Sequence, residues 1–260
     1  QPMTMFFRVA NVDDSIVDAY VVQHPEERGR LFHPYVETAK LNGDFPLMRD
    51  KAGIYRTQER GVWRVNTSRI QRLDGTNARD LVDAELEGRE QVQILMRFFR
   101  KYLPGFEKAV LMDTAVQIGV RETRRIIGAY TLTADDLATG RSFDDVVALA
   151  SFPVDLHPVL GDGGGTDTGL AMGFKTAPVY QIPYRCLVPN GVEQLLVAGR
   201  SVSGTREALA AIRVMPVCFA LGQAAGVAGA MAVADETPVR DIETGRLQMI
   251  LVKQGAILSV

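Results

Sequence analysis

The feature that most constrains this chain is an uncharged segment of 21 residues, 214–234, near its C-terminus. The segment is long enough to cross a bilayer, and Gly222 and Gly226 have the spacing of closely packed membrane helices. Seven of its residues are Ala and three are Gly, with Gln223 in the middle and Pro216 near the start. Because Ala and Gly favour insertion only weakly, we expect no membrane span here. The segment predicts a helix buried against a sheet or a ligand.

The composition of the whole chain is that of a globular protein, with 47% hydrophobic and 23% charged residues. A net charge of −2 leaves no electrostatic footprint for nucleic acid. The two cysteines, Cys186 and Cys218, form no CxxC pair, which we take to exclude a disulfide scaffold and a structural zinc site. We therefore expect no metal and a reducing compartment, the cytoplasm. The opening residues also lack the pattern of a signal peptide.

Periodicity and turn residues predict the order of the elements. Residues 1–70 are expected to form short strands and loops, and Met3, Met5 and Phe7 share one strand face. Asn77 is the expected N-cap of a long helix that ends at Pro104. The elements expected after it are an extended stretch over 108–131, short helices around 133–139 and near 142–150, a loop over 161–169, strands over 178–188 and 192–199, and helices over 215–234 and 242–253, the last one capped by Asp241.

A strand–turn–helix unit follows from this order near the C-terminus. The turn contains Arg200 and Ser203, and it lies between the strand at 192–199 and the helix from 215. In α/β proteins, strand ends that lead into helix N-termini hold phosphates and cofactors. A plain connection with no ligand explains the same pattern equally well.

Several motifs together resemble one known family. They are RVNTSRI (64–70), LDGTNARDL (73–81), GVRETRRIIG (119–128), IPYRCLVP (182–189), LLVAGR (195–200), RVMPVCFALGQAAG (213–226) and KQGAIL (253–258). In this order and spacing they resemble the C-terminal part of the FAD-dependent oxidoreductases, flavoproteins related in fold to the glutathione-reductase-like class. The resemblance implies α/β and α+β structure. It assigns residues 1–177 to a substrate domain and residues 178–260 to the last strand and helix of a Rossmann-like FAD-binding domain.

One motif of such flavoproteins is not in this sequence. Their N-terminal βαβ unit carries G-x-G-x-x-G, and the glycine-rich stretch at 161–169 does not have that spacing. We therefore expect an N-terminal FAD-binding half, in the same protein or as a separate subunit, to be the partner of this chain. The chain is expected to hold FAD poorly by itself.

The resemblance also assigns residues to the cofactor. It places Gly199 and Arg200 at the ribityl–pyrophosphate part of FAD, and Val214, Met215 and Pro216 at the N1–C2=O edge of the flavin. Backbone N–H groups and a helix dipole stabilise the negative charge that reduction puts there. Small residues such as Gly222 then allow close packing against the cofactor, although helix packing alone also explains them.

The sequence offers further candidates for binding the substrate and for proton transfer. Arg121, with Arg124 and Arg125 nearby, can clamp a carboxylate, but salt bridges to Glu122 are the alternative. His157 lies beside Asp155 and matches a family histidine, so it is a candidate general acid or base, or else a structural histidine. Tyr184 and Arg185 can line the substrate face of the flavin, and because a strand alternates its side chains, only one of them is expected there.

The leading interpretation is a component of an enzyme in which FAD accepts hydride or electrons from a small, anionic organic substrate. The alternative is a non-catalytic subunit or fragment without bound flavin, which serves assembly or metabolite binding. The sequence leaves open whether the chain forms a homo-oligomer.

Overall fold

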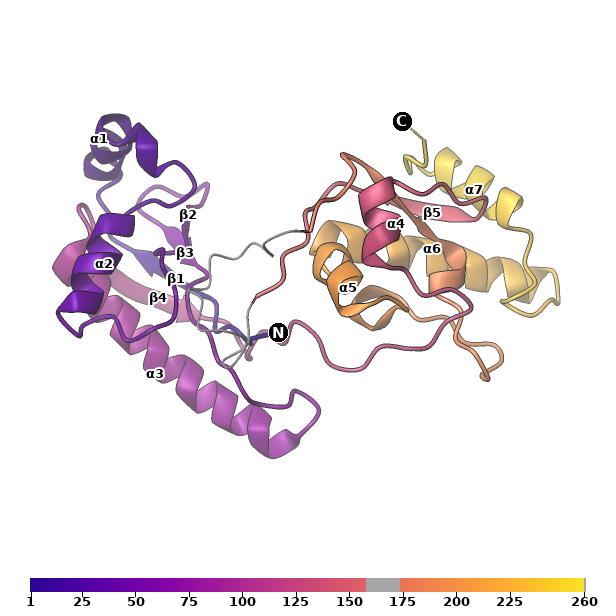
Figure 1. Cartoon of the computed structure of the whole chain (residues 1–260), viewed down its shortest axis with the longest axis horizontal. Helices are drawn as coiled ribbons and strands as arrows, with labels where there is room; N and C mark the ends of the chain where they lie inside the picture. Colours follow the sequence, from indigo (N-terminus) through magenta and orange to yellow (C-terminus); the bar gives the residue numbers. More distant parts are fainter. Residues whose placement is uncertain (158–173, 260) are drawn as a thin grey trace. The chain divides into compact units, whose positions relative to one another are not determined.

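The computed structural model describes residues 1–157 and 174–259. Its helices and small antiparallel sheets confirm the expected mixture of α/β and α+β structure. The chain divides into two compact units (Figure 1): Gln1–Arg121 with His157 is unit 1, and residues 122–156 with 174–259 are unit 2. The predicted loop at 161–169 lies outside the described residues. The predicted domains, 1–177 and 178–260, concern the parts of a flavoprotein, and this division stays a prediction.

Unit 1 is built on a four-stranded antiparallel sheet. Its strands, in the order β2-β3-β1-β4 across the sheet, are β2 (Ile54–Arg56), β3 (Trp63–Val65), β1 (Phe7–Ala10) and β4 (Val110–Thr114). Phe7 lies opposite Val65 on one side and Thr114 on the other. The predicted strand face is confirmed, since Met3, Met5 and Phe7 are all buried.

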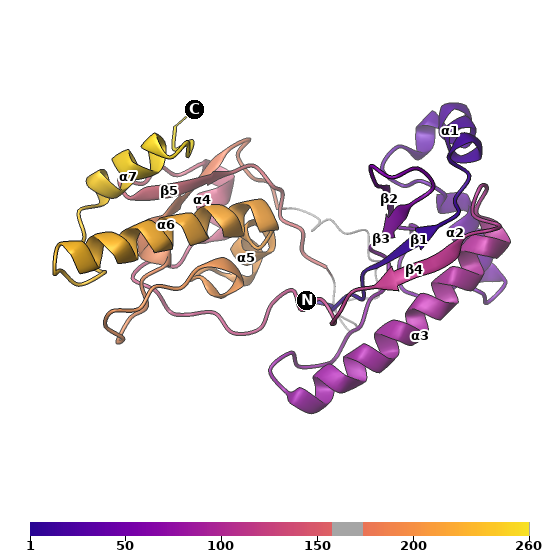
Figure 2. The same cartoon turned by 180° about the vertical axis from the view of Figure 1, so that it is seen from behind.

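The predicted long helix of unit 1 is confirmed as α3 (Ala78–Tyr102). The side chain of Asn77 caps it by accepting from the backbone N–H of Arg79 at 2.8 Å. The helix runs alongside the sheet (Figure 2), and its buried face packs there, with the rings of Phe7 and Phe99 6.2 Å apart.

The expectation of only strands and loops in residues 1–70 is wrong. This region also forms α1 (Asp14–Gln23), a 3-10 turn η1 (Pro25–Glu27) and α2 (His33–Leu41). Pro25 and Pro34 stand in the first turns of η1 and α2, where the missing N–H has no partner within the helix to lose. Asp13 caps α1 by accepting from the N–H groups of Ser15 and Ile16.

The sheet of unit 2 corrects three expectations. Residues 146–150 form a strand, β5 (Val146–Ala150), not a helix, and it pairs antiparallel with β6 (Tyr180–Pro183). A short apolar run has no periodicity that separates strand from helix, and here the partner strand decides. The strand expected over 178–188 ends at Pro183 in the 3-10 turn η2 (Tyr184–Cys186). Residues 192–199 are irregular, because no strand among the described residues forms a ladder with them.

The helices of unit 2 are α4 (Ala134–Thr139), α5 (Arg206–Ile212), α6 (Met215–Ala234) and α7 (Thr244–Lys253). The bounds predicted for α6 are confirmed, and Pro216 stands in its first turn. The last helix is capped by Glu243 and not by Asp241. In both views α6 lies along β5 and α7 (Figures 1 and 2), and these contacts bury one of its faces.

The expectation that α6 packs against a sheet is confirmed by its contacts with β5, but only one of its faces is buried. Within the described residues, α6 is the one helix long and apolar enough to cross a membrane, and 33% of its most apolar window is buried. Met215 is 69% exposed, Phe219 72% and Val233 81%. The described residues of this chain therefore leave an apolar face of the helix uncovered.

Candidate functional site

The predicted site residues belong to both units, and each group is described within its own unit. Arg121 and His157 lie in unit 1. Those in unit 2 are Arg185, Gly199, Arg200, Ser203, Val214, Met215, Pro216 and Gly222.

The N-terminus of α6 offers backbone N–H groups and positive dipole charge. Val214 is the N-cap, and no side chain among the described residues caps the helix there. The first intrahelical bond runs from Cys218 N to Val214 O at 3.0 Å, so the N–H groups of Met215 and Val217 have no partner within the helix. The first turn contains no acidic residue. This end of α6 therefore suits an anionic group.

Sequence reasoning passed over Arg213, which directly precedes the N-cap. Its side chain is only 10% exposed, and its Nη2 donates to the carbonyl oxygen of Asp155 at 3.0 Å and to Oδ2 at 2.9 Å. Burial lowers the pKa of this guanidinium, although the nearby Asp155 carboxylate opposes the shift. The sequence signal that could have identified Arg213 is its position immediately before the start of α6. A cation there adds to the positive end of the helix dipole.

The turn before α5 presents two of the predicted residues at the surface and one in the interior. Gly199 begins the 3-10 turn η3 (Gly199–Ser201), which contacts α6. Its φ is +76°, and a Cβ there would have no neighbour within 4 Å. Arg200 is exposed. Ser203 is fully buried, its Oγ lies 3.0 Å from Thr131 Oγ1, and its N–H donates to the carbonyl of Cys186, so it ties the turn to the core.

Small residues line the uncovered face of α6. Gly222 and Gly226 are exposed, and a Cβ on either would meet no atom within 4 Å. The predicted close packing of Gly222 is therefore not made by this chain's described residues. The open space lies on the same face as Phe219.

Arg185 is held by an acid next to the sheet of unit 2. Its backbone N–H and its Nε both donate to Asp145 Oδ2, at 3.0 and 2.9 Å, and its Nη2 donates to Oδ1 at 3.0 Å. The guanidinium also lies over the ring of Tyr130, 5.5 Å from its centre. The neighbouring Cys186 is buried, and desolvation raises the pKa of its thiol to about 12. Cys186 is therefore a core residue, as its apolar surroundings in the sequence indicated.

Residues 1–4 bring together the substrate-side candidates of unit 1. Arg121 Nη1 donates to the carbonyl of Pro2. The N–H of His157, a buried residue, donates to Gln1 Oε1 at 3.5 Å. The buried Arg69, which sequence reasoning did not single out, donates through Nη1 to Thr4 Oγ1 at 3.4 Å and to Ser68 O at 2.8 Å.

Near Arg121, the structure shows salt bridges to Glu122, which were the alternative to a carboxylate clamp. Arg125 Nη1 lies 3.6 Å from Glu122 Oε2, and Arg206 Nε lies 3.9 Å from Glu122 Oε1. The predicted salt bridge between Arg125 and Glu122 is thus confirmed. Residues 121–127 form no strand, so strand alternation does not bring Arg121 and Arg125 to one face.

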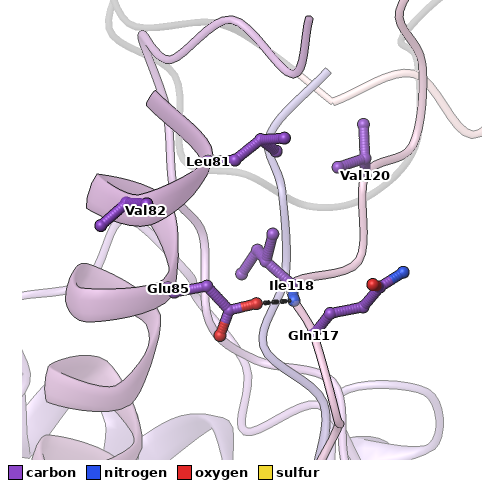
Figure 3. A pocket seen from close by; sticks show the side chains of 6 residues that line it. All are labelled: Leu81, Val82, Glu85, Gln117, Ile118 and Val120. Carbon is purple, nitrogen blue, oxygen red and sulfur yellow. Dashed lines mark hydrogen bonds between the residues drawn. The ribbon is translucent and has the colours of Figure 1, made fainter. Parts of the chain in front are cut away.

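Figure 3 shows a groove of about 260 Å³ between α3 and residues 117–120 of unit 1. Its lining residues are Leu81, Val82, Glu85, Gln117, Ile118 and Val120. The Glu85 carboxylate accepts from the Ile118 N–H with one oxygen and from Arg89 Nη2, at 3.0 Å, with the other. None of the predicted site residues lines this groove. Its one carboxylate, that of Glu85, is already engaged in the hydrogen bond that fixes Ile118.

Comparison with known proteins gives one result. The family model described as FAD dependent oxidoreductase matches residues 1–251. No curated protein and no solved structure matches the chain.

Proposed function

The chain belongs to the FAD-dependent oxidoreductase family, and on that premise we propose that unit 2 forms one wall of the flavin site of an enzyme acting on a small anionic substrate. FAD is the cofactor of this family, which gives the chain a flavin-linked redox role. When bound, the flavin accepts a hydride or electrons from the substrate. The protein binds, orients and stabilises charge.

The observation that carries this proposal is the uncapped N-terminus of α6. Its free N–H groups at Met215 and Val217 fit the acceptor edge of a flavin, and the helix dipole favours negative charge there. Arg213, which directly precedes the N-cap, is largely buried and paired with Asp155. Gly199 leaves room for a ligand to approach the backbone, and the exposed Arg200 can pair with a phosphate. These residues fit the cofactor.

The uncovered face of α6 supports the need for a second half. Met215, Phe219 and Val233 expose apolar side chains along one side of a helix whose other side is packed. Residues 192–199 form no strand ladder with the other described residues, and Leu195 is 43% exposed. A FAD-binding half with G-x-G-x-x-G would cover this face and pair with this segment. We expect this partner because the sequence itself holds no such motif.

The substrate side is proposed for unit 1. Arg121, Arg69 and His157 converge on residues 1–4, and two arginines suit a substrate with a carboxylate or phosphate group. Arg121 would orient this anion, and the His157 imidazole would hold or move a proton. Arg185 remains a candidate at the substrate face if the flavin half displaces it from Asp145. Because both cysteines are free, the cytoplasm remains the expected compartment.

The test is the visible absorbance of the purified chain after incubation with FAD and desalting. It is recorded for the chain alone and for the chain co-expressed with a G-x-G-x-x-G half from a member of the same family. We expect flavin bands only with that half. Bands retained by the chain alone would show that the second half is not needed, and no bands in either sample would refute the flavin site.

A further inference from the structure

Outside the proposed flavin site, the turn that follows α1 (Figure 1) gathers three metal-ligating side chains: His24, Glu26 and Glu27. One ligand atom from each lies within 4.8 Å of the others. His24 Nδ1 is 3.1 Å from Glu26 Oε1. Two ligands of a tetrahedral zinc ion lie about 3.4 Å apart, given bonds of 2.0–2.2 Å. Side-chain rotations that bring separations of at most 4.8 Å to about 3.4 Å would place the three atoms at coordinating distance.

The Glu27 carboxylate is the buried member of this set. The residue is 7% exposed, and no lysine or arginine of the described residues forms an ion pair with it. Its two oxygens accept from neutral donors, the Tyr20 hydroxyl at 2.6 Å and the Phe32 N–H at 2.7 Å. Each carboxylate oxygen still has a second lone pair. A buried carboxylate without a countercharge is costly, and a bound cation would remove that cost.

The surroundings hold the ligands in place and leave a path for an ion. The His24 ring stacks on Tyr20 with 4.2 Å between the ring centres, and Tyr20 also orients Glu27. Pro25 restricts the backbone between the ligands. The side chains of His24 and Glu26 are 39% and 67% exposed, so solvent reaches the cluster.

We propose that His24, Glu26 and Glu27 bind a divalent transition-metal ion of the zinc class, with water completing the coordination. An imidazole nitrogen with carboxylate oxygens is a ligand set that suits such an ion. The ion would fasten the end of α1 to η1 and neutralise Glu27. This proposal departs from the expectation of no metal, which rested on the cysteines, because none of these three ligands is a thiolate.

The test is calorimetric titration of the tag-free full chain with zinc chloride. We expect one zinc ion per chain, a rise in Tm with zinc, and an affinity at least tenfold lower in both His24→Ala and Glu26→Gln. These two positions are exposed, and circular dichroism checks that the variants keep the fold.

His33→Ala is the matched control, because His33 pairs with one glutamate only, Nε2 lying 3.2 Å from Glu37 Oε1. Its zinc affinity should equal that of the unaltered chain. The proposal is overturned if the chain binds no zinc, if His24→Ala and Glu26→Gln leave the affinity unchanged, or if His33→Ala abolishes binding.

Discussion

Replacing Gly226 by leucine should change stability and cofactor binding in opposite directions. Gly226 lies inside α6 on its uncovered face, and a Cβ at this position would meet no atom within 4 Å. Leucine therefore enters the helix without a clash in the chain alone. If the face is covered by a FAD-binding half, the same leucine meets that half.

The magnitudes follow from helix propensity and packing. Glycine in an exposed helix interior costs roughly 0.5–1 kcal/mol relative to a good helix former, so Gly226→Leu should stabilise the chain by about that amount. The corresponding rise in Tm is roughly 1–4 °C. Overpacking a close interface costs about 1–3 kcal/mol, which is a roughly 5- to 150-fold weaker association with the FAD-binding half.

The assay combines urea denaturation of the chain alone with FAD retention of the co-expressed complex after desalting. Ala138→Leu, on the exposed surface of α4, is the matched control and should leave FAD retention unchanged. A Gly226→Leu chain that is more stable yet retains FAD as well as the unaltered complex would refute the proposal that this face is covered. A loss of stability would refute the reasoning that the space beside Gly226 is open.

Two further predictions concern unit 2. Gly199→Ala should lower the free energy of unfolding by about 1 kcal/mol, because alanine is strained at a φ of +76°; urea denaturation measures this, and Gly226→Ala should shift stability the opposite way. Asp136→Asn should cost about 1–3 kcal/mol at pH 7, because the buried carboxylate accepts from Thr133, Tyr130 and Arg141. Burial tends to raise the pKa of Asp136, but these hydrogen bonds outweigh it and lower the pKa below its ordinary value. The stabilisation is therefore present above about pH 4 and is lost as pH falls through the lowered pKa, so the variant should show a flatter stability profile in acid. An unchanged acid slope in Asp136→Asn would contradict this assignment.

Much of the site became visible in the sequence only through motif resemblance. The turn residues Gly199 and Arg200 and the start of α6 are recognised from their order in the chain. Their chemistry depends on partners far away in sequence: Arg213 is buried against Asp155, and Arg185 is bound by Asp145. Spacing along the chain carries no information about such pairs, so Arg213 and Arg69 went unnoticed.

Local signals by themselves determined α3 and α6. Asn77, the apolar stripe of α3 and Pro216 act within a few residues of where they stand, and the helices begin and end where these signals place them. Tertiary structure alone decided that residues 146–150 form a strand, because β6 pairs with them. It also decided that one face of α6 stays open, since burial is set by what packs against a helix. The uncharged segment determined that α6 needs apolar neighbours, and the fold of this chain supplies them on one side.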